Sequence, residues 1–328
     1  MTLRTTRDAS EAVEVLRRGG LVALPTETVY GLAGDATSAS AIARIFAAKG
    51  RPTNHPVIVH LPDQSHVDRW AVDTPQWATD LMSQVWPGPL TVIVPRAPSV
   101  LDAVTGGQST VGLRVPAHPL TLEVLGQLDT GVAAPSANRY GRVSPTTAVH
   151  VVAELSAHLD PERDLVLDGG PCPVGVESTI IGAWDDVPRL LRPGAVTTQR
   201  VASITGRQPV TTSSGVRAPG TTATHYSPSA NVVAIERDDL EATLEDLPGD
   251  KKVGVIALAD VDTSAQPVTR LSSPGDQEEY AQTLYAALHQ ADISGMEIVI
   301  AVLPPPGGLG AAIRDRLRRA AAAERAVQ

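Results

Sequence analysis

Two kinds of hydrophobic and polar pattern alternate along the first two hundred positions of the chain. Short apolar runs bounded by turn residues predict buried β-strands, whereas apolar residues three and four positions apart predict amphipathic helices. The predicted strands lie at 21–25, 56–61, 90–95, 110–116, 131–135, 164–168, 178–183 and 189–193, and the predicted helices at 9–18, 38–48, 75–85, 118–128, 146–156 and 197–206. Because the two kinds of element alternate, we expect an α/β fold with a twisted, partly parallel sheet covered by helices.

A change in composition separates this part from the rest of the chain. Residues 207–228 hold many Thr, Ser, Gly and Pro and few long aliphatic side chains, which is typical of a linker. Beyond the linker, strand patterns at 231–236, 252–259 and 296–303 alternate with helix patterns at 238–246, 277–290 and 309–323. The sequence therefore predicts a first domain over 1–206, a linker over 207–228 and a small three-layer α/β domain over 229–328.

The composition of the 328 residues narrows the class of protein. Apolar residues make up 42% of the chain, which is enough to fill two cores. The formal net charge of −9 argues against a protein that binds nucleic acid over most of its surface. Much of the negative charge lies in residues 229–328, which carry 16 Asp and Glu against 9 Lys and Arg. The single cysteine, Cys172, excludes an internal disulfide, and no apolar run approaches the ~20 residues of a membrane helix. The N-terminus lacks the apolar segment of a secretory signal, so we expect a cytoplasmic protein outside the membrane.

Several common signatures of catalysis are missing from the sequence. It contains no GxxxxGK(S/T) phosphate loop, no GxGxxG after a strand, no HExxH pair and no GxSxG elbow. The missing motifs argue against the usual nucleotide hydrolases, dehydrogenases, zinc enzymes and serine hydrolases. What remains are polar clusters in loops that follow predicted strands, where open α/β sheets bind ligands.

Two of these clusters lie in the first sixty residues. The string PTETVYG (25–31) could orient a small polar substrate or simply cap a turn. Lys49 is the only lysine before residue 251, and it stands two positions from Arg51 in a Gly/Pro loop. The two cations suit either a phosphate or carboxylate ligand, or the C-terminal dipole of the preceding helix.

Three further clusters follow along the chain. Arg114 lies inside an apolar strand and needs a partner, which is either a structural carboxylate or the carboxylate of a substrate. The string AAPSANRYGRVSPTT (133–147) offers hydroxyl, amide and backbone N–H groups to an anion, or forms an ordinary polar loop. In GGPCPVGVESTIIG (169–182), Cys172 has no base beside it in the sequence, which argues against a catalytic thiol.

Together these strings closely resemble the YrdC-like family of L-threonylcarbamoyladenylate synthases. The resemblance rests on GGLVALPTETVYGLAGDA, KGRPTNHPVIVH, WPGPLTVIVP, VGLRVPAHP, APSAN, GVESTII and LLRPG, which occur in this order over residues 1–206. HYSP (225–228) and the α/β tail resemble the long form of the family, which has an extra C-terminal domain. The resemblance implies a YrdC-like twisted mixed sheet with helices around a large positively charged cavity, followed by a small Rossmann-like domain.

The resemblance also implies a reaction. L-Threonine, bicarbonate and ATP would be condensed into threonylcarbamoyl-AMP with release of pyrophosphate, the first step of t6A modification of tRNA. ATP is then a substrate, Mg²⁺ arrives bound to its phosphates, and the product passes to the tRNA threonylcarbamoyl transferase complex. We expect a monomer or a weak dimer, and direct tRNA binding stays open. Two other interpretations are a carbamoyltransferase-type YrdC protein and an RNA-binding module without turnover.

The family's motifs further imply roles for individual residues of this chain. The family's catalytic tetrad falls on Lys49, Arg51, Ser136 and Asn138. Threonine would be bound by Thr26, His60, Arg114, the backbone of Ala134, and Ser178. ATP would be bound by Lys49, Thr53, Thr110, Ser136, Ser144, Arg192 and Tyr226, and no residue is expected to bind a metal directly.

The linker is expected to lie over the active site as a lid. One departure from the long form stands immediately before HYSP, where PGTTAT (219–224) replaces a stretch that is usually basic and rich in aromatic residues. A cation expected near the phosphates is therefore missing, and Arg217 is the candidate to replace it.

Overall fold

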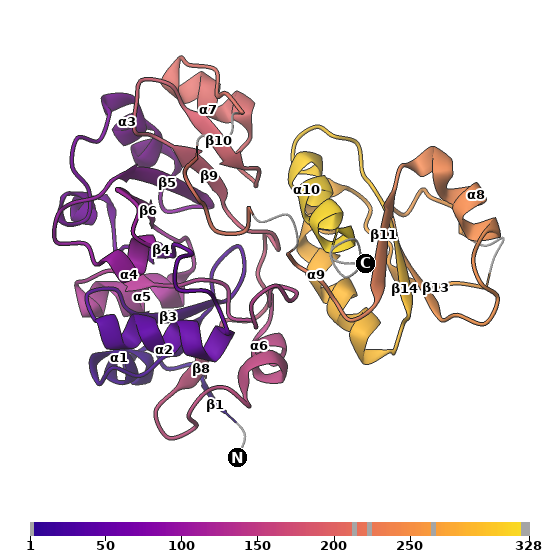
Figure 1. The fold of residues 1–328 in the computed structure, drawn as a ribbon, viewed down its shortest axis with the longest axis horizontal. Coiled ribbons are helices and arrows are strands. Elements are labelled where there is room, and N and C mark those ends of the chain that lie inside the picture. Colours follow the sequence, from indigo (N-terminus) through magenta and orange to yellow (C-terminus); the bar gives the residue numbers. More distant parts are fainter. Residues whose placement is uncertain (1–2, 212–214, 222–224, 264–266, 323–328) are drawn as a thin grey trace. The chain divides into compact units, whose positions relative to one another are not determined.

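The computed structural model describes residues 3–211, 215–221, 225–263 and 267–322, and the chain divides into two compact units. The first unit comprises Met1–Tyr140, Pro145–Pro173 and Glu177–Thr221. The second comprises Thr222–Gln328 together with two short earlier segments, Gly141–Ser144 and Val174–Val176. In Figure 1 the first unit runs from indigo to salmon, and the second unit is orange to yellow except for its two short earlier segments.

The first unit is built on one mixed sheet of ten described strands. Their order across the sheet is β1-β8-β2-β3-β7-β4-β6-β5-β9-β10. Neighbours are parallel in β1–β8, β2–β8, β4–β6 and β5–β9, and antiparallel in the other five pairs. The strands are β1 (Arg4–Thr6), β2 (Val22–Leu24), β3 (Gly31–Asp35), β4 (Ile58–His60), β5 (Leu90–Pro95), β6 (Thr110–Arg114), β7 (Val132–Ala133), β8 (Leu165–Leu167), β9 (Thr179–Gly182) and β10 (Arg189–Arg192).

Several helices cover this sheet through an apolar stripe, and others pack on those helices. Helix α2 (Ala39–Lys49) begins at Ser38, whose hydroxyl caps the first turn, and buries Ile42 and Ile45. It ends where Gly50 takes a left-handed φ of 62°. The other described helices are α1 (Ala9–Arg17), α3 (Gln76–Val85), α4 (Asp102–Thr105), α5 (Pro119–Leu128), α6 (Ala148–Leu155) and α7 (Thr198–Thr205), with a 3₁₀ turn η1 (Gln64–Arg69).

The sequence pattern locates most of these elements correctly. Every strand and helix predicted for the first domain is present, with its ends within two residues of the prediction. Strands β1 and β3 are not predicted, and β3 is missed because its sequence GLAGD indicates a turn. A Cβ at Gly34 would lie 3.0 Å from the side chain of Leu21 and 3.1 Å from that of Ile45, so the glycine lets these two side chains pack closely on the strand.

The second unit contains a parallel sheet of four described strands in the order β11-β14-β12-β13. Helices α9 and α10 lie on one face of this sheet and α8 on the other (Figure 1). The elements are β11 (Asn231–Ile235), η2 (Arg237–Asp239), α8 (Leu240–Glu245), β12 (Val253–Ile256), β13 (Thr269–Ser272), α9 (Gln277–Ile293), β14 (Ile298–Val302) and α10 (Gly310–Ala321). This arrangement confirms the predicted three-layer α/β architecture, to which the structure adds β13.

Much of the predicted linker is attached to the first unit. Val210 forms a β-bridge with Arg189, and the N–H of Arg217 donates to Oε1 of Gln108 at 2.7 Å. The Gln108 amide in turn donates to the carbonyl of Arg217 at 3.0 Å. Residues 212–214 and 222–224, which include part of PGTTAT, lie outside the described residues. No helix in the described ranges has the length and apolar character needed to cross a membrane.

Candidate active site

One face of the large sheet collects several side chains that the sequence singles out. The register places His60 on β4 beside Arg114 on β6. Alternate residues of a strand share a face, so Thr110 lies on the same face of β6 as Arg114. Ile180 on β9 is paired with Arg192 on β10 and continues this face toward the edge of the sheet.

A small apolar cluster lies on the same face of the sheet. It is formed by Ile58, Ile93 and Ile180 from three strands and by Ala218 from the linker. Ala218 is only 7% exposed. This part of the linker is therefore packed against the face that carries the candidate site.

Lys49 is buried where α2 ends, with 2% of its surface exposed. Its Nζ donates to the backbone oxygens of Ser136 at 2.5 Å and Asn138 at 2.6 Å, and lies 3.5 Å from Oδ1 of Asn138. The loop after β7 is thus folded around the ammonium, and three of the four tetrad residues are in contact. Burial, reinforced by the charge of Arg51, holds the pKa of Lys49 well below its usual value.

Arg51 lies beside this group. Its guanidinium stands 5.7 Å from the ring centre of Tyr140, whose N–H donates to the carbonyl of Lys49 at 2.8 Å. Burial and the charges of Arg51 and Arg217 lower the pKa of His55. Arg51 and Arg217 therefore create an electropositive region suited to phosphate oxygens. Arg217 acts on the same histidine as Arg51.

Arg114 has a carboxylate partner within the chain. Its Nη2 donates to Oε1 of Glu27 at 2.6 Å and its Nε to the carbonyl of Gly88 at 3.3 Å. The second oxygen of Glu27 accepts from the N–H of Ala117 at 2.9 Å. Nη1 of Arg114 has no partner among the described residues, so it still has hydrogens to offer to a ligand. The structural ion pair that the sequence offers as one alternative is therefore present, and it occupies only Nη2 of the guanidinium.

His60 and Cys172 are both uncharged beside this pair. Burial and the charge of Arg114 hold the pKa of His60 at about 3, and its Nδ1 is buried without a hydrogen-bond partner. Burial also raises the pKa of Cys172 to about 12, with a further contribution from the charge of Glu27. A thiol that stays protonated is a poor nucleophile, which agrees with the interpretation that Cys172 is not catalytic.

Thr26 shapes the loop that carries Glu27. Its hydroxyl donates to the carbonyl of Val29 at 2.6 Å and accepts from the N–H groups of Thr28 at 3.1 Å and Val29 at 3.2 Å. These contacts correspond to the turn-capping alternative for PTETVYG. Ala134 uses its N–H to donate to the carbonyl of Ile58 at 3.1 Å, next to the same face of the sheet.

Ser178 and Arg192 form one buried network. Nη2 of Arg192 donates to the carbonyl of Ser178 at 2.9 Å and to its Oγ at 3.1 Å. The hydroxyls of Ser178 and Thr91 share a hydrogen bond of 2.7 Å. Nη1 of Arg192 donates to the carbonyl of Pro219 in the linker at 2.9 Å. The sequence does not identify Thr91 as a site residue, because its only signal is a polar residue within the apolar string LTVIVP.

The remaining predicted ATP ligands are less closely connected. Thr53 is exposed and Thr110 is buried, and within the described ranges no hydrogen bond joins either side chain to the Lys49 group. Ser144 and Tyr226 belong to the second unit. There the carbonyl of Ser144 is 3.2 Å from Nε2 of His289, and the ring of Tyr226 stacks on Tyr285 at 5.7 Å between centroids.

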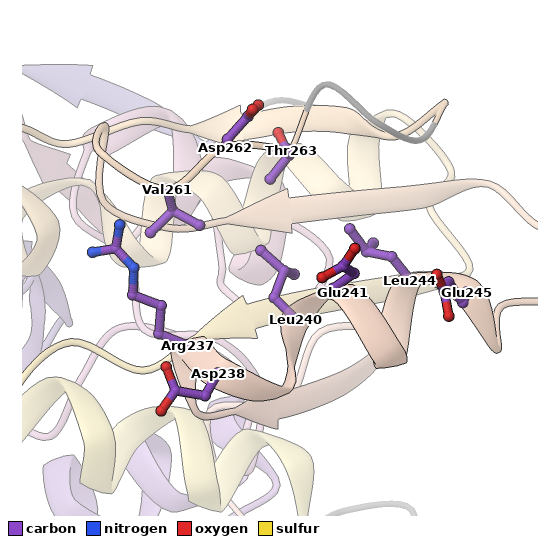
Figure 2. A pocket seen from close by; sticks show the side chains of 9 residues that line it. All are labelled: Arg237, Asp238, Leu240, Glu241, Leu244, Glu245, Val261, Asp262 and Thr263. Atoms are coloured by element: carbon purple, nitrogen blue, oxygen red, sulfur yellow. The ribbon is translucent and has the colours of Figure 1, made fainter.

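A pocket of about 390 Å³ lies in the second unit, beside α8 and the segment after β12 (Figure 2). Its lining combines the apolar side chains of Leu240, Leu244 and Val261 with the carboxylates of Asp238 and Glu241 (Figure 2). It contains none of the residues that the sequence singles out, so it is not part of the candidate site.

Comparisons with known proteins cover nearly the whole chain. A family model described as telomere recombination matches residues 14–194, and one described as the C-terminal domain of threonylcarbamoyl-AMP synthase matches residues 195–322. The threonylcarbamoyl-AMP synthase of Pyrococcus abyssi is 38% identical over 323 residues, covering 94% of this chain and 92% of the relative. The threonylcarbamoyl-AMP synthase of Bacillus subtilis is 37% identical over 325 residues, covering 95% and 92%. The crystal structure of P. abyssi Sua5 complexed with L-threonine matches with a TM-score of 0.88 and 34% identity, covering 98% of each chain.

Proposed function

The chain belongs to the family of threonylcarbamoyl-AMP synthases, and we propose that it makes threonylcarbamoyl-AMP from L-threonine, bicarbonate and ATP with release of pyrophosphate. The observation that carries the proposal is the presence, in one unit, of a carboxylate-binding group around Arg114 and an electropositive group around Lys49. We propose that the product passes to the tRNA threonylcarbamoyl transferase complex. The enzyme would act in the cytoplasm as a monomer or a weak dimer.

Threonine is proposed to bind at the sheet face that carries His60 and Arg114. The relative with bound L-threonine supports an amino-acid site in this fold. Nη1 of Arg114 would donate to the substrate carboxylate, and neutral His60 would add a hydrogen bond without adding charge. Thr26, the backbone of Ala134, and Ser178 are proposed to complete the site.

ATP is proposed to bind at the Lys49 group. Lys49, Arg51 and Arg192 would balance the charge of the phosphates as pyrophosphate leaves. Thr53, Thr110, Ser136, Ser144 and Tyr226 are proposed as further ATP ligands, and Asn138 as a member of the catalytic tetrad. Mg²⁺ would enter bound to the phosphates and supply additional charge balance; in the described part of the chain no group of three His, Cys, Asp or Glu side chains is arranged to hold a metal.

The chemistry demands that two steps occur close together. The threonine amine attacks bicarbonate, forming an N–C bond with loss of water, and the resulting carbamate decomposes readily in water. A carbamate oxygen then attacks the α-phosphorus of ATP, and the bond to the leaving pyrophosphate breaks. Holding the carbamate beside the α-phosphorus is therefore the main task of the site. Ala218, packed on the same sheet face, supports our proposal that the linker acts as a lid excluding water.

The direct test is pyrophosphate release by the purified chain with ATP, bicarbonate and each amino acid in turn. We expect release that requires both threonine and bicarbonate and that is lost in Lys49→Ala. Lys251→Ala is the matched control, because Lys251 is an exposed lysine of the second unit that pairs with Glu297.

The outcomes separate the alternatives. Release without dependence on threonine would favour a carbamoyltransferase-type activity. No release with any amino acid, combined with binding of RNA, would favour a binding module. Trapping of a covalent adenylyl-enzyme would contradict direct attack by the carbamate.

A further inference from the structure

Glu27 is a buried carboxylate inside the proposed threonine site to which no motif assigns a role. Its side chain is 9% exposed and stands between the guanidinium of Arg114 at 2.6 Å and the N–H of Ala117 at 2.9 Å. A carboxylate so deeply buried is stable only when its charge is balanced and its oxygens are hydrogen-bonded. Both conditions are met here, so the geometry of Glu27 is fixed.

Glu27 in turn fixes Arg114. The guanidinium is held by the carboxylate at Nη2 and by the carbonyl of Gly88 at Nε. Rotation of the guanidinium would break both bonds and leave the carboxylate of Glu27 without its cation. Nη1, which has no partner among the described residues, is therefore presented in one direction only.

The Arg114–Glu27 pair carries no net charge before a substrate binds. Arg114 contributes one positive charge and Glu27 one negative charge at 2.6 Å. His60 and Cys172, which adjoin the pair, are both uncharged at neutral pH. A ligand that carries a single negative charge would bring an unbalanced charge into this buried place, whereas a zwitterion would not.

We propose that Glu27 is the positioning and specificity residue of this site. It holds Arg114 in place for the carboxylate of the ligand. It also makes the Arg114–Glu27 pair neutral, so that an amino-acid zwitterion is preferred over a carboxylate that lacks the ammonium group. The inference rests on the proposed function, since it concerns how threonine is chosen.

The test compares two ligands that differ only in the ammonium group, L-threonine and 3-hydroxybutyrate. Their dissociation constants are measured by calorimetry for the full chain and for Glu27→Gln, which keeps the shape of the side chain and removes its charge. The matched control is Asp164→Asn. Asp164 is also a buried carboxylate held by an arginine, Arg44 at 2.8 Å, and by the N–H of Leu21 at 2.8 Å, but it is outside the site.

We expect Glu27→Gln to weaken threonine binding about 10- to 100-fold, the range for a hydrogen bond to a charged group. The binding of 3-hydroxybutyrate should weaken less, because removing the negative charge of Glu27 favours an anionic ligand and offsets part of the lost positioning. Asp164→Asn should lower the melting temperature and change the threonine constant by less than about twofold. If Glu27→Gln does not fold, Glu27→Asp, which keeps the charge, is expected to retain the preference for threonine over 3-hydroxybutyrate.

Unchanged threonine affinity in Glu27→Gln would overturn the positioning role. Equal weakening of both ligands would overturn the selectivity, as would loss of the preference in Glu27→Asp. Pyrophosphate release by the wild-type chain is measured in parallel. Failure of the proposed reaction then shows as threonine binding without turnover, whereas failure of this inference shows as turnover with unchanged selectivity in the variant.

Discussion

His60 makes the stability of the first unit depend on pH in a way that can be calculated. Burial and Arg114 hold its pKa at about 3 in the folded chain, against 6.5 for an ordinary histidine. The unfolded chain therefore takes up a proton on this residue as the pH falls below about 6.5, while the folded chain takes it up only near pH 3. Stability from this group is fully present above pH 6.5 and is lost as the pH falls through that window.

The size of the effect follows from the two pKa values of His60. Each pKa unit corresponds to about 1.4 kcal/mol, so the complete loss below pH 3 approaches about 5 kcal/mol. Between pH 7 and pH 5 the loss is about 2 kcal/mol, because over that range the unfolded state gains most of a proton and the folded state none. A domain stabilised by about 5–15 kcal/mol would show this change clearly.

The assay is urea unfolding at pH 7 and pH 5, followed by tryptophan fluorescence. This signal reports on the first unit alone, because all four tryptophans lie in it: Trp70, Trp77, Trp86 and Trp184. The variant His60→Gln cannot titrate, so its loss of stability between the two pH values should be smaller than that of the wild type by about 2 kcal/mol. Equal losses in the two proteins would refute the argument that His60 is neutral and desolvated in the fold.

Three further substitutions test other parts of the site. Lys49→Met should lower the rate of pyrophosphate release by at least ~100-fold, as for loss of one preorganised charged donor. The control Lys251→Met should leave the rate unchanged. Equal rates in the two variants would show that Lys49 takes no part in the reaction. Thr91→Val deletes the hydroxyl that bonds Ser178, and the KM for threonine should rise about three- to tenfold in steady-state kinetics; an unchanged KM would separate Thr91 from the site. Ala218→Asp places a carboxylate against three isoleucines and should loosen the linker from the sheet. Limited thermolysin digestion should then cut residues 215–221 faster than in the wild type. Unchanged cleavage would show that Ala218 does not hold the linker against the sheet.

The elements of the fold could be predicted because burial leaves a periodic signal. Strands such as LTVIVP and helices such as α2 follow the spacing of their apolar residues, and their ends match within two residues. Strand β3 could not be found this way. Gly31 lies close to Ala134 and Gly34 lies close to Ile45 of α2, and neighbours so remote in sequence leave no periodic pattern in GLAGD.

In the candidate site, too, contacts within a known motif could be predicted, whereas contacts between residues far apart in the sequence could not. Contact between Lys49 and the loop of Ser136 and Asn138 is implied by the family motif, and the structure gives its form as an ammonium held by two carbonyl groups. Thr91 could not be assigned, because its role depends on Ser178, 87 positions away. A hydroxyl within an apolar strand signals only that some partner exists.

Arg114 illustrates why the sequence leaves two interpretations of one residue open. A charged residue inside an apolar strand demands a partner, and 36 acidic residues could supply it. The structure selects Glu27, yet it satisfies only Nη2 and Nε of the guanidinium and leaves Nη1 unpaired among the described residues. A second carboxylate at Nη1 would complete the hydrogen bonding of the guanidinium without displacing Glu27. The incomplete satisfaction of Arg114, more than its burial, is therefore the feature that points to a bound carboxylate.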